Sequence, residues 1–118
     1  MLKKNCLLEM SEVGDELRVS LSGEIDHHSA VPVRAEIDER IAICRPRRTV
    51  LELSGIDFMD SSGLGLIMGR YAKMKAIGGD LVISRPGERM LKIIRLAGLE
   101  RIVTIEGISE GEENKDEA

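Results

Sequence analysis

The sequence predicts an α/β fold in which helices cover a mixed, mostly parallel β-sheet. Apolar residues alternate along the chain between the two-residue period of strands and the 3.6-residue period of helices. Two strand-like segments come first, separated by the turn sequence VGDE, so the chain opens with a hairpin. The later strand-like segments are separated by helical ones, an order typical of parallel neighbours in a sheet. A length of 118 residues suits one domain with a single core.

The first half of the chain contains the hairpin, a helix and a central strand. Segments 5–11 and 16–22 are the expected hairpin strands. The helix is expected to run from Ser29 to Cys44, with Ser29 as its N-cap and apolar residues at helical spacing. The segment 49–53, rich in strand-forming residues, is expected to lie in the middle of the sheet.

The second half repeats the order of helix and strand. Its first helix begins at Ser61 or Ser62 and is expected to run to Ala76, where Gly78 and Gly79 end it. The expected apolar face of this helix comprises Leu64, Ile67, Met68, Tyr71 and Met74. The remaining expected elements are a strand at 81–83, a helix at 88–97 and a last strand at 102–105.

The charge distribution divides the chain into a domain and a tail. Residues 107–118 carry five acidic residues and one basic residue, which accounts for the net charge of −4, and the preceding residues balance 16 acidic against 16 basic ones. We therefore expect a domain at 1–106 and a disordered acidic tail at 107–118. Neither part has the positive charge that nucleic-acid binders use against phosphates, and an aromatic content of 2% leaves few rings for base stacking. We expect no nucleic-acid partner.

The cysteines and the apolar segments indicate the compartment. Cys6 and Cys44 lack the spacing of metal ligands and are expected to be reduced, partly buried residues. The N-terminal segment lacks the apolar stretch of a signal peptide, and no apolar run approaches the roughly 20 residues that span a bilayer. We expect a cytoplasmic protein with no membrane partner, whose core consists of aliphatic side chains.

Two polar clusters lie where expected strands give way to helices, which is where open α/β sheets usually place their sites. One is LSGEIDHHSA, residues 21–30, and the other is DFMDSSGLGLIMGRY, residues 57–71. Asp26, His27 and His28 could contribute metal ligands together with an aspartate of the second cluster. Adjacent histidines on an extended loop diverge, however, and the sequence has no metal-binding motif. We expect neither a metal nor a cofactor.

Catalytic and nucleotide-binding interpretations of the second cluster are weak. A hydrolase would use Ser61 or Ser62 with a histidine and an aspartate, but the surrounding sequence is not G-x-S-x-G and a carboxylate precedes the serines. The glycines at 63, 65 and 69 miss the dinucleotide-binding spacing by one residue. Close packing explains them better, because Gly65 and Gly69 share a helix face that a strand or a partner can approach. We expect no enzyme, with a small Ser/His hydrolase as the least favoured alternative.

The serine pair has two possible roles. Asp60, Ser61 and Ser62 are all good N-caps, so they could simply satisfy free backbone N–H groups at the start of a helix. The second possibility is a phosphoacceptor, since a phosphoryl group adds roughly −1.5 to −2 charges. The helix dipole would tolerate that charge, whereas Asp57 and Asp60 would repel it. Phosphorylation could thus alter a binding surface without unfolding the domain.

Four segments together resemble the bacterial anti-sigma factor antagonists, and those of sporulation most of all. They are LSGEIDHHSA and DFMDSSGLGLIMGRY, followed by IGGDLVI and LAGLERIV, and the resemblance runs from about residue 5 to 106. It implies the STAS fold, a mixed sheet with packed helices. Members of this family commonly continue into a final amphipathic helix, whereas GISEGEENKDEA has almost no apolar face.

The resemblance also implies a partner-switching mechanism. The unmodified protein would bind an anti-sigma factor that is also a serine kinase, which frees the sigma factor. The kinase, with its bound ATP, would phosphorylate Ser61 and so release the antagonist, and a PP2C-type phosphatase would restore it. An antagonist of another pathway, such as general stress, is the alternative. The partner-binding residues that we expect are Asp26, His27, Asp60, Ser61, Ser62, Gly63 and Gly65.

Overall fold

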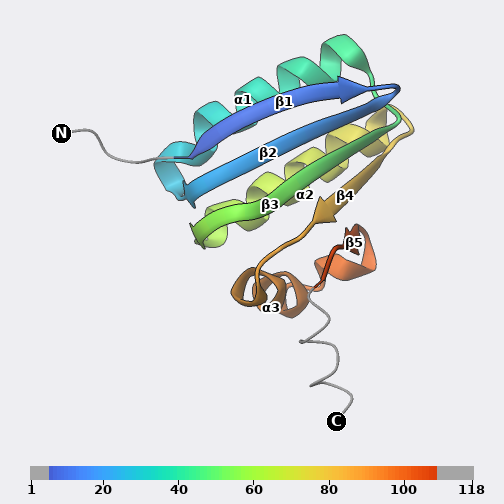
Figure 1. Cartoon of the computed structure of the whole chain (residues 1–118). Coiled ribbons are helices and arrows are strands. Elements are labelled where there is room, and N and C mark those ends of the chain that lie inside the picture. The colour runs from blue at the N-terminus through green and yellow to red at the C-terminus, as the bar shows by residue number, and fades with distance from the viewer. Residues whose placement is uncertain (1–5, 109–118) are drawn as a thin grey trace, which may run out of the picture.

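A single five-stranded sheet forms the centre of this computed structural model, which describes residues 6–108 (Figure 1). The sheet order is β1-β2-β3-β4-β5; β1 and β2 are antiparallel, and every later pair is parallel. This confirms the mixed, mostly parallel sheet. The elements are β1 (Leu7–Val13), β2 (Glu16–Ile25), α1 (His27–Cys44), β3 (Arg48–Met59), α2 (Ser61–Ala76), β4 (Asp80–Ser84), α3 (Glu88–Leu96), the 3₁₀-helix η1 (Leu99–Arg101) and β5 (Thr104–Glu106).

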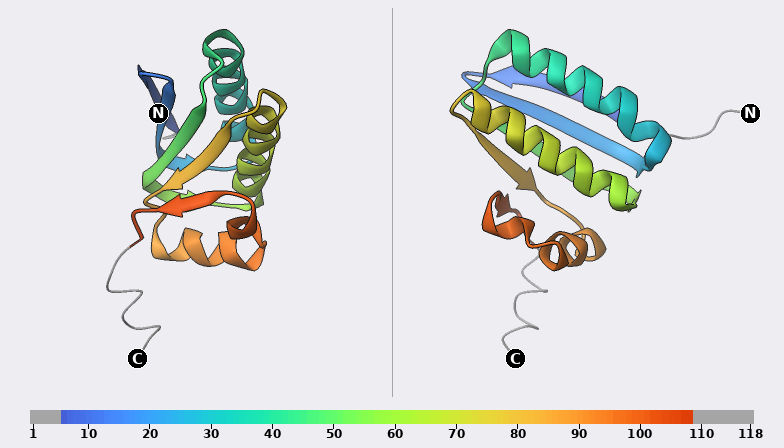
Figure 2. Two further views of the ribbon diagram at one scale, coloured as in Figure 1. Left: turned by 90° about the vertical axis from the view of Figure 1, so that its right-hand side faces the viewer. Right: turned by 180° about the vertical axis from the view of Figure 1, so that it is seen from behind.

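The helices α1 and α2 lie side by side on one face of the sheet (Figure 2). Their buried side chains meet those of the strands in one aliphatic core, as the composition predicts. Burying this apolar surface is the main force that holds the helices on the sheet. Fully buried members of the core include Leu17, Leu21, Ile25, Ile37, Leu51, Leu53, Ile67, Met74, Leu81, Ile83 and Ile94. No described helix is long and apolar enough to cross a membrane.

The start of α1 differs from the expected one. The helix begins at His27 and its N-cap is Asp26, not Ser29. The Asp26 carboxylate accepts the backbone N–H groups of His28 and Ser29, both at 2.9 Å. The Ser29 hydroxyl accepts the backbone N–H of Asp26 at 2.9 Å, which completes a capping box. The expectation that Ser29 is the N-cap is wrong because an aspartate three residues earlier takes this role.

Several strand and helix ends also differ from expectation. The strand β3 extends to Met59, well beyond the expected end at Leu53, because its second half continues to pair with β2 after a shift in register. Gly55 allows this pairing, since a Cβ there would lie 2.8 Å from the Cβ of Ser22. The last strand begins at Thr104, not at Ile102, because the backbone N–H groups of Ile102 and Val103 donate to the carbonyl of Leu99 in η1. Of the expected acidic tail, residues 109–118 lie outside the described residues.

Candidate functional site

The two polar clusters meet at the C-terminal ends of the neighbouring strands β2 and β3. Ile25, the last residue of β2, is paired with Met59, the last residue of β3. The next residues along the chain, Asp26 and Asp60, are the N-caps of α1 and α2. The backbone N–H of Asp60 donates to the carbonyl of Ile25 at 3.2 Å, which joins the two helix starts directly. The two polar clusters therefore lie side by side at the starts of α1 and α2.

Asp60 caps α2 and leaves the first serine free. Its carboxylate accepts the backbone N–H of Ser62 at 2.7 Å, and its carbonyl accepts the N–H of Gly63 at 2.9 Å. Ser61 is exposed and Ser62 half-buried. Among the described residues, no side-chain hydrogen bond uses the hydroxyl of Ser61. The capping role thus belongs to Asp60, and the Ser61 hydroxyl is accessible at the first position of the helix.

Asp26 is a charged cap beside this serine-bearing turn. The pKa of Asp26 lies below its ordinary value of 3.8, mainly because its carboxylate accepts a hydrogen bond from the backbone N–H of Ser29. The N–H of His28 acts in the same direction. Both donors belong to the first turn of α1, whose free N–H groups favour a negative charge. Asp26 therefore remains ionised at neutral pH.

The three glycines of α2 do not share one role. A Cβ on Gly63 would overlap Cγ and Sδ of Met59, so this glycine lets the first turn of α2 pack closely on the end of β3. A Cβ on Gly65 or Gly69 would meet no atom within 4 Å. Gly65 and Gly69 were expected to allow close approach by a strand or by a partner. Among the described residues, approach by a strand is wrong. Approach by a partner stays a prediction.

The expected apolar face of α2 is partly wrong. Met68 is 52% exposed, whereas Leu66, which was not expected in the core, is buried. Met68 follows Ser61 by seven residues, two helical turns, so both lie on the same side of α2. Phe58, near the end of β3, is 44% exposed. The seven-residue spacing from Ser61 was the signal in the sequence that places Met68 on the side of α2 that carries Ser61.

The two histidines lie at the start of α1. The rings of His27 and His28 pack edge to face, with their centroids 5.3 Å apart, and both residues are exposed. No hydrogen bond among the described residues joins either ring to Ser61 or Ser62. No group of three or more His, Cys, Asp or Glu within residues 6–108 is arranged to hold a metal ion. Because neither histidine ring bonds to either serine among the described residues, a hydrolase triad has no geometric support.

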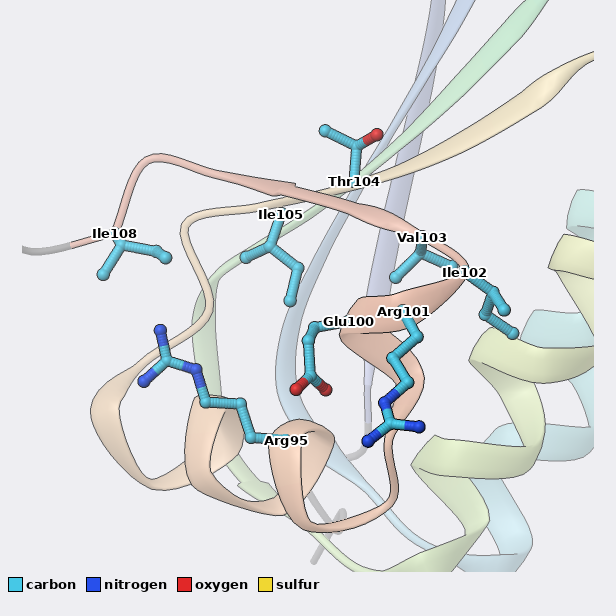
Figure 3. A pocket seen from close by; sticks show the side chains of 8 residues that line it. All are labelled: Arg95, Glu100, Arg101, Ile102, Val103, Thr104, Ile105 and Ile108. Atoms are coloured by element: carbon cyan, nitrogen blue, oxygen red, sulfur yellow. The ribbon is translucent and has the colours of Figure 1, made fainter.

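A separate groove lies beside β5, the last strand in the sheet order (Figure 3). It has a volume of about 480 Å³ and is built from α3, η1, β5 and the residues near them. None of the expected site residues contributes to it. The lining residues are Arg95, Glu100, Arg101, Ile102, Val103, Thr104, Ile105 and Ile108.

The chain is similar in sequence to a known family of domains. The family model for the STAS domain matches residues 8–113, so the chain belongs to the STAS domain family. An anti-sigma F factor antagonist from Paenibacillus polymyxa is 38% identical over 101 residues, which cover 86% of each chain. An anti-sigma-B factor antagonist from Bacillus subtilis (strain 168) is 30% identical over 113 residues, 91% of this chain and 96% of that protein.

Solved structures show the same fold. The anti-sigma factor antagonist SpoIIAA in its unphosphorylated form has a TM-score of 0.71 and 25% identity, covering 93% of this chain and 96% of that one. The phosphorylated form of SpoIIAA, a Bacillus cell fate determinant, has a TM-score of 0.69 and 26% identity, covering 95% and 100%. The STAS fold expected from the sequence is confirmed.

Proposed function

We propose that this chain is an anti-sigma factor antagonist whose binding is switched off by phosphorylation of Ser61. The observation that carries the proposal is the exposed hydroxyl of Ser61 at the first position of α2, which forms no side-chain hydrogen bond with residues 6–108, while Asp60 already fills the capping role. The relatives named anti-sigma factor antagonists support the class of function. A protein of this kind acts by binding and has no reaction of its own to catalyse.

The partner would bind on a surface that we name the Ser61 face. It comprises the exposed residues Ser61, Gly65, Met68 and Ala72, which recur every three or four positions along α2. An exposed methionine supplies an adaptable apolar contact, and Gly65 lets another chain approach the helix backbone. Asp26 and His27 would extend this surface over the start of α1, and Asp60, Ser62 and Gly63 would hold the turn that presents Ser61.

Phosphorylation would change this surface without rebuilding the fold. The serine Oγ would attack the γ-phosphorus of ATP and lose its proton, with ADP as the leaving group. The new group adds roughly −1.5 to −2 charges. The first turn of α2 tolerates a negative charge, whereas Asp60 repels it. At an interface that buries the Ser61 face, an unpaired charge costs about 2–5 kcal/mol, enough to release a partner.

The partners of the switch are those that the resemblance to anti-sigma factor antagonists implies. An anti-sigma factor that is also a serine kinase would both bind the Ser61 face and modify it with its own ATP. A phosphatase of the PP2C type would remove the phosphate and restore binding. The matched sigma-F and sigma-B antagonists leave two pathways as candidates, and the higher identity of 38% against 30% favours the sigma-F type of partner.

Intact-mass spectrometry with ATP and the anti-sigma kinase encoded in the same genome tests the proposal. We expect one added phosphate on the wild type and on Ser62→Ala, and none on Ser61→Ala. Ser61→Ala should still bind the kinase, and the phosphorylated wild type should not. Phosphorylation of Ser61→Ala would move the acceptor elsewhere. An unmodified wild type in the presence of a demonstrably active kinase would overturn the switch.

A further inference from the structure

The outer side of β1 is an edge of the sheet that residues 6–108 form. The strand order begins with β1, and no other described strand pairs with its outer side (Figure 1). Leu7 and Val13, at the two ends of β1, are 60% and 62% exposed. A strand edge with unpaired backbone groups readily adds another strand. A suitable occupant must supply that strand and must also cover two apolar side chains.

The hairpin determines which backbone groups of β1 point outward. Gly14 has a φ of +64°, and the two-residue turn of Gly14 and Asp15 connects the closing pair Val13 and Glu16. The closing pair of a two-residue hairpin is hydrogen-bonded, and such pairs alternate with non-hydrogen-bonded pairs along the ladder. Every second residue counted back from Val13 thus bonds to β2. The residues whose N–H and C=O groups point away from β2 are Leu8, Met10 and Glu12.

We propose that the occupant is a second copy of this chain, with the two β1 strands antiparallel about a two-fold axis at Met10. This register places the outward groups of Met10 opposite those of Met10 in the second copy. It also places Leu8 opposite Glu12 of the second copy, and Glu12 opposite Leu8. Three residue pairs with two bonds each give about six backbone hydrogen bonds. A two-fold axis requires such a self-complementary surface.

The side chains fit the same register. Leu7 lies opposite Val13 of the second copy in a non-hydrogen-bonded pair, where side chains are closest, so the two most exposed apolar residues of β1 cover each other. Glu9 lies opposite Ser11 and meets no like charge. Moving the axis to Glu12 would instead place two carboxylates opposite each other, which disfavours that register.

The helix above β1 is also charge-complementary to its copy. Arg40 lies on the β1 side of α1, because Nη1 is 3.4 Å from Oε2 of Glu12. Glu36 lies on the same side, where it lines a groove of about 320 Å³ together with Leu7 and Leu8. The two-fold axis turns α1 antiparallel to its copy, so Glu36 of one copy comes to face Arg40 of the other. The inference uses none of the residues of the Ser61 face and stands independently of the proposed function.

Sedimentation equilibrium of the full chain tests the proposal, at concentrations up to about 1 mM, the weak end of specific association. We expect the average mass of the wild type to rise from 13.0 kDa towards twice that value. The variant Leu7→Lys/Val13→Lys places like charges opposite each other and should stay monomeric. Its matched control, Leu7→Glu/Val13→Lys, places opposite charges there and should dimerise.

Two outcomes would overturn this dimer. One is a wild type that keeps the monomer mass throughout the concentration range. The other is equal dimerisation of the two double variants, which would place the interface elsewhere. A third variant, Met10→Pro, removes the N–H of Met10. Because this N–H points away from β2, the hydrogen bonds between β1 and β2 remain. The variant should weaken dimerisation at least tenfold while its thermal unfolding remains cooperative.

Discussion

The guanidinium of Arg70 on α2 pairs with the carboxylate of Asp38 on α1. Nε lies 2.8 Å from Oδ1, and Nη2 donates to Oδ2 at 3.2 Å; the Nε–H is not aligned on Oδ1, so the Nη2 bond is the well-formed one. The Arg70 side chain is 3% exposed and that of Asp38 24%. Burial lowers the pKa of Arg70 below its ordinary value, and the attraction of Asp38 opposes this. This pair links the two helices whose first turns form the candidate site.

Removing the carboxylate should therefore destabilise the protein. In Asp38→Asn, we expect the free energy of unfolding to fall by about 2 kcal/mol, less than for a fully buried pair because Asp38 is partly exposed. Adding Arg70→Met should recover most of the loss, because the double variant leaves no unpaired charge between the two helices. Urea denaturation of both single variants and the double variant measures the coupling. Additive effects in the double variant would contradict it.

Alanine substitutions should distinguish the two kinds of glycine in α2. Gly63→Ala should lower the free energy of unfolding by about 1–3 kcal/mol, because its methyl group would overlap the buried side chain of Met59. Gly65→Ala, in open space on the same helix, should raise it by up to about 1 kcal/mol through helix propensity. Thermal unfolding of the two variants side by side gives the comparison. Effects of the same sign would contradict the packing role of Gly63.

Local signals account for what the sequence predicts correctly. The helix α2 runs from Ser61 to Ala76 as expected, because an aspartate before two serines and a pair of glycines after the helix leave little choice of ends. The α1 start was missed because Asp26 and Ser29 both suit the N-cap position, and only the capping box decides between them.

Long-range pairing accounts for most of what the sequence could not predict. The strand β3 continues through a serine and a glycine that ordinarily end strands, because β2 offers backbone partners as far as Met59. Met68 looks like a core residue by its type, and only the position of the sheet shows that the Met68 side chain faces away from the sheet. The meeting of Asp26 with Asp60 depends on the same pairing of β2 with β3.

The charge of Asp26 should make part of the stability depend on pH. Its pKa is lowered in the folded protein, so ionised Asp26 stabilises the fold above its ordinary pKa of 3.8, and this contribution is lost as the pH falls through the lower folded value. Asp26→Asn keeps a capping oxygen but removes the charge. We expect the variant to be less stable than the wild type at pH 7, with a difference that shrinks below pH 3.8. Denaturation at both pH values checks this, and a constant difference would contradict it.

Met68 should matter for binding and not for folding. It is 52% exposed on the Ser61 face, so Met68→Glu leaves the core intact but places a charge where the proposed partner binds. We expect at least tenfold weaker binding to the anti-sigma factor, about 1.4 kcal/mol, with an unchanged melting temperature. Ile43→Glu is the matched control, because Ile43 is 71% exposed near the C-terminal end of α1, whereas the candidate site lies at the N-terminal end of that helix. Calorimetric titration of the unphosphorylated proteins measures both affinities. If Met68→Glu binds as tightly as Ile43→Glu, the partner does not use this face of α2, even where Ser61 proves to be the phosphorylated residue.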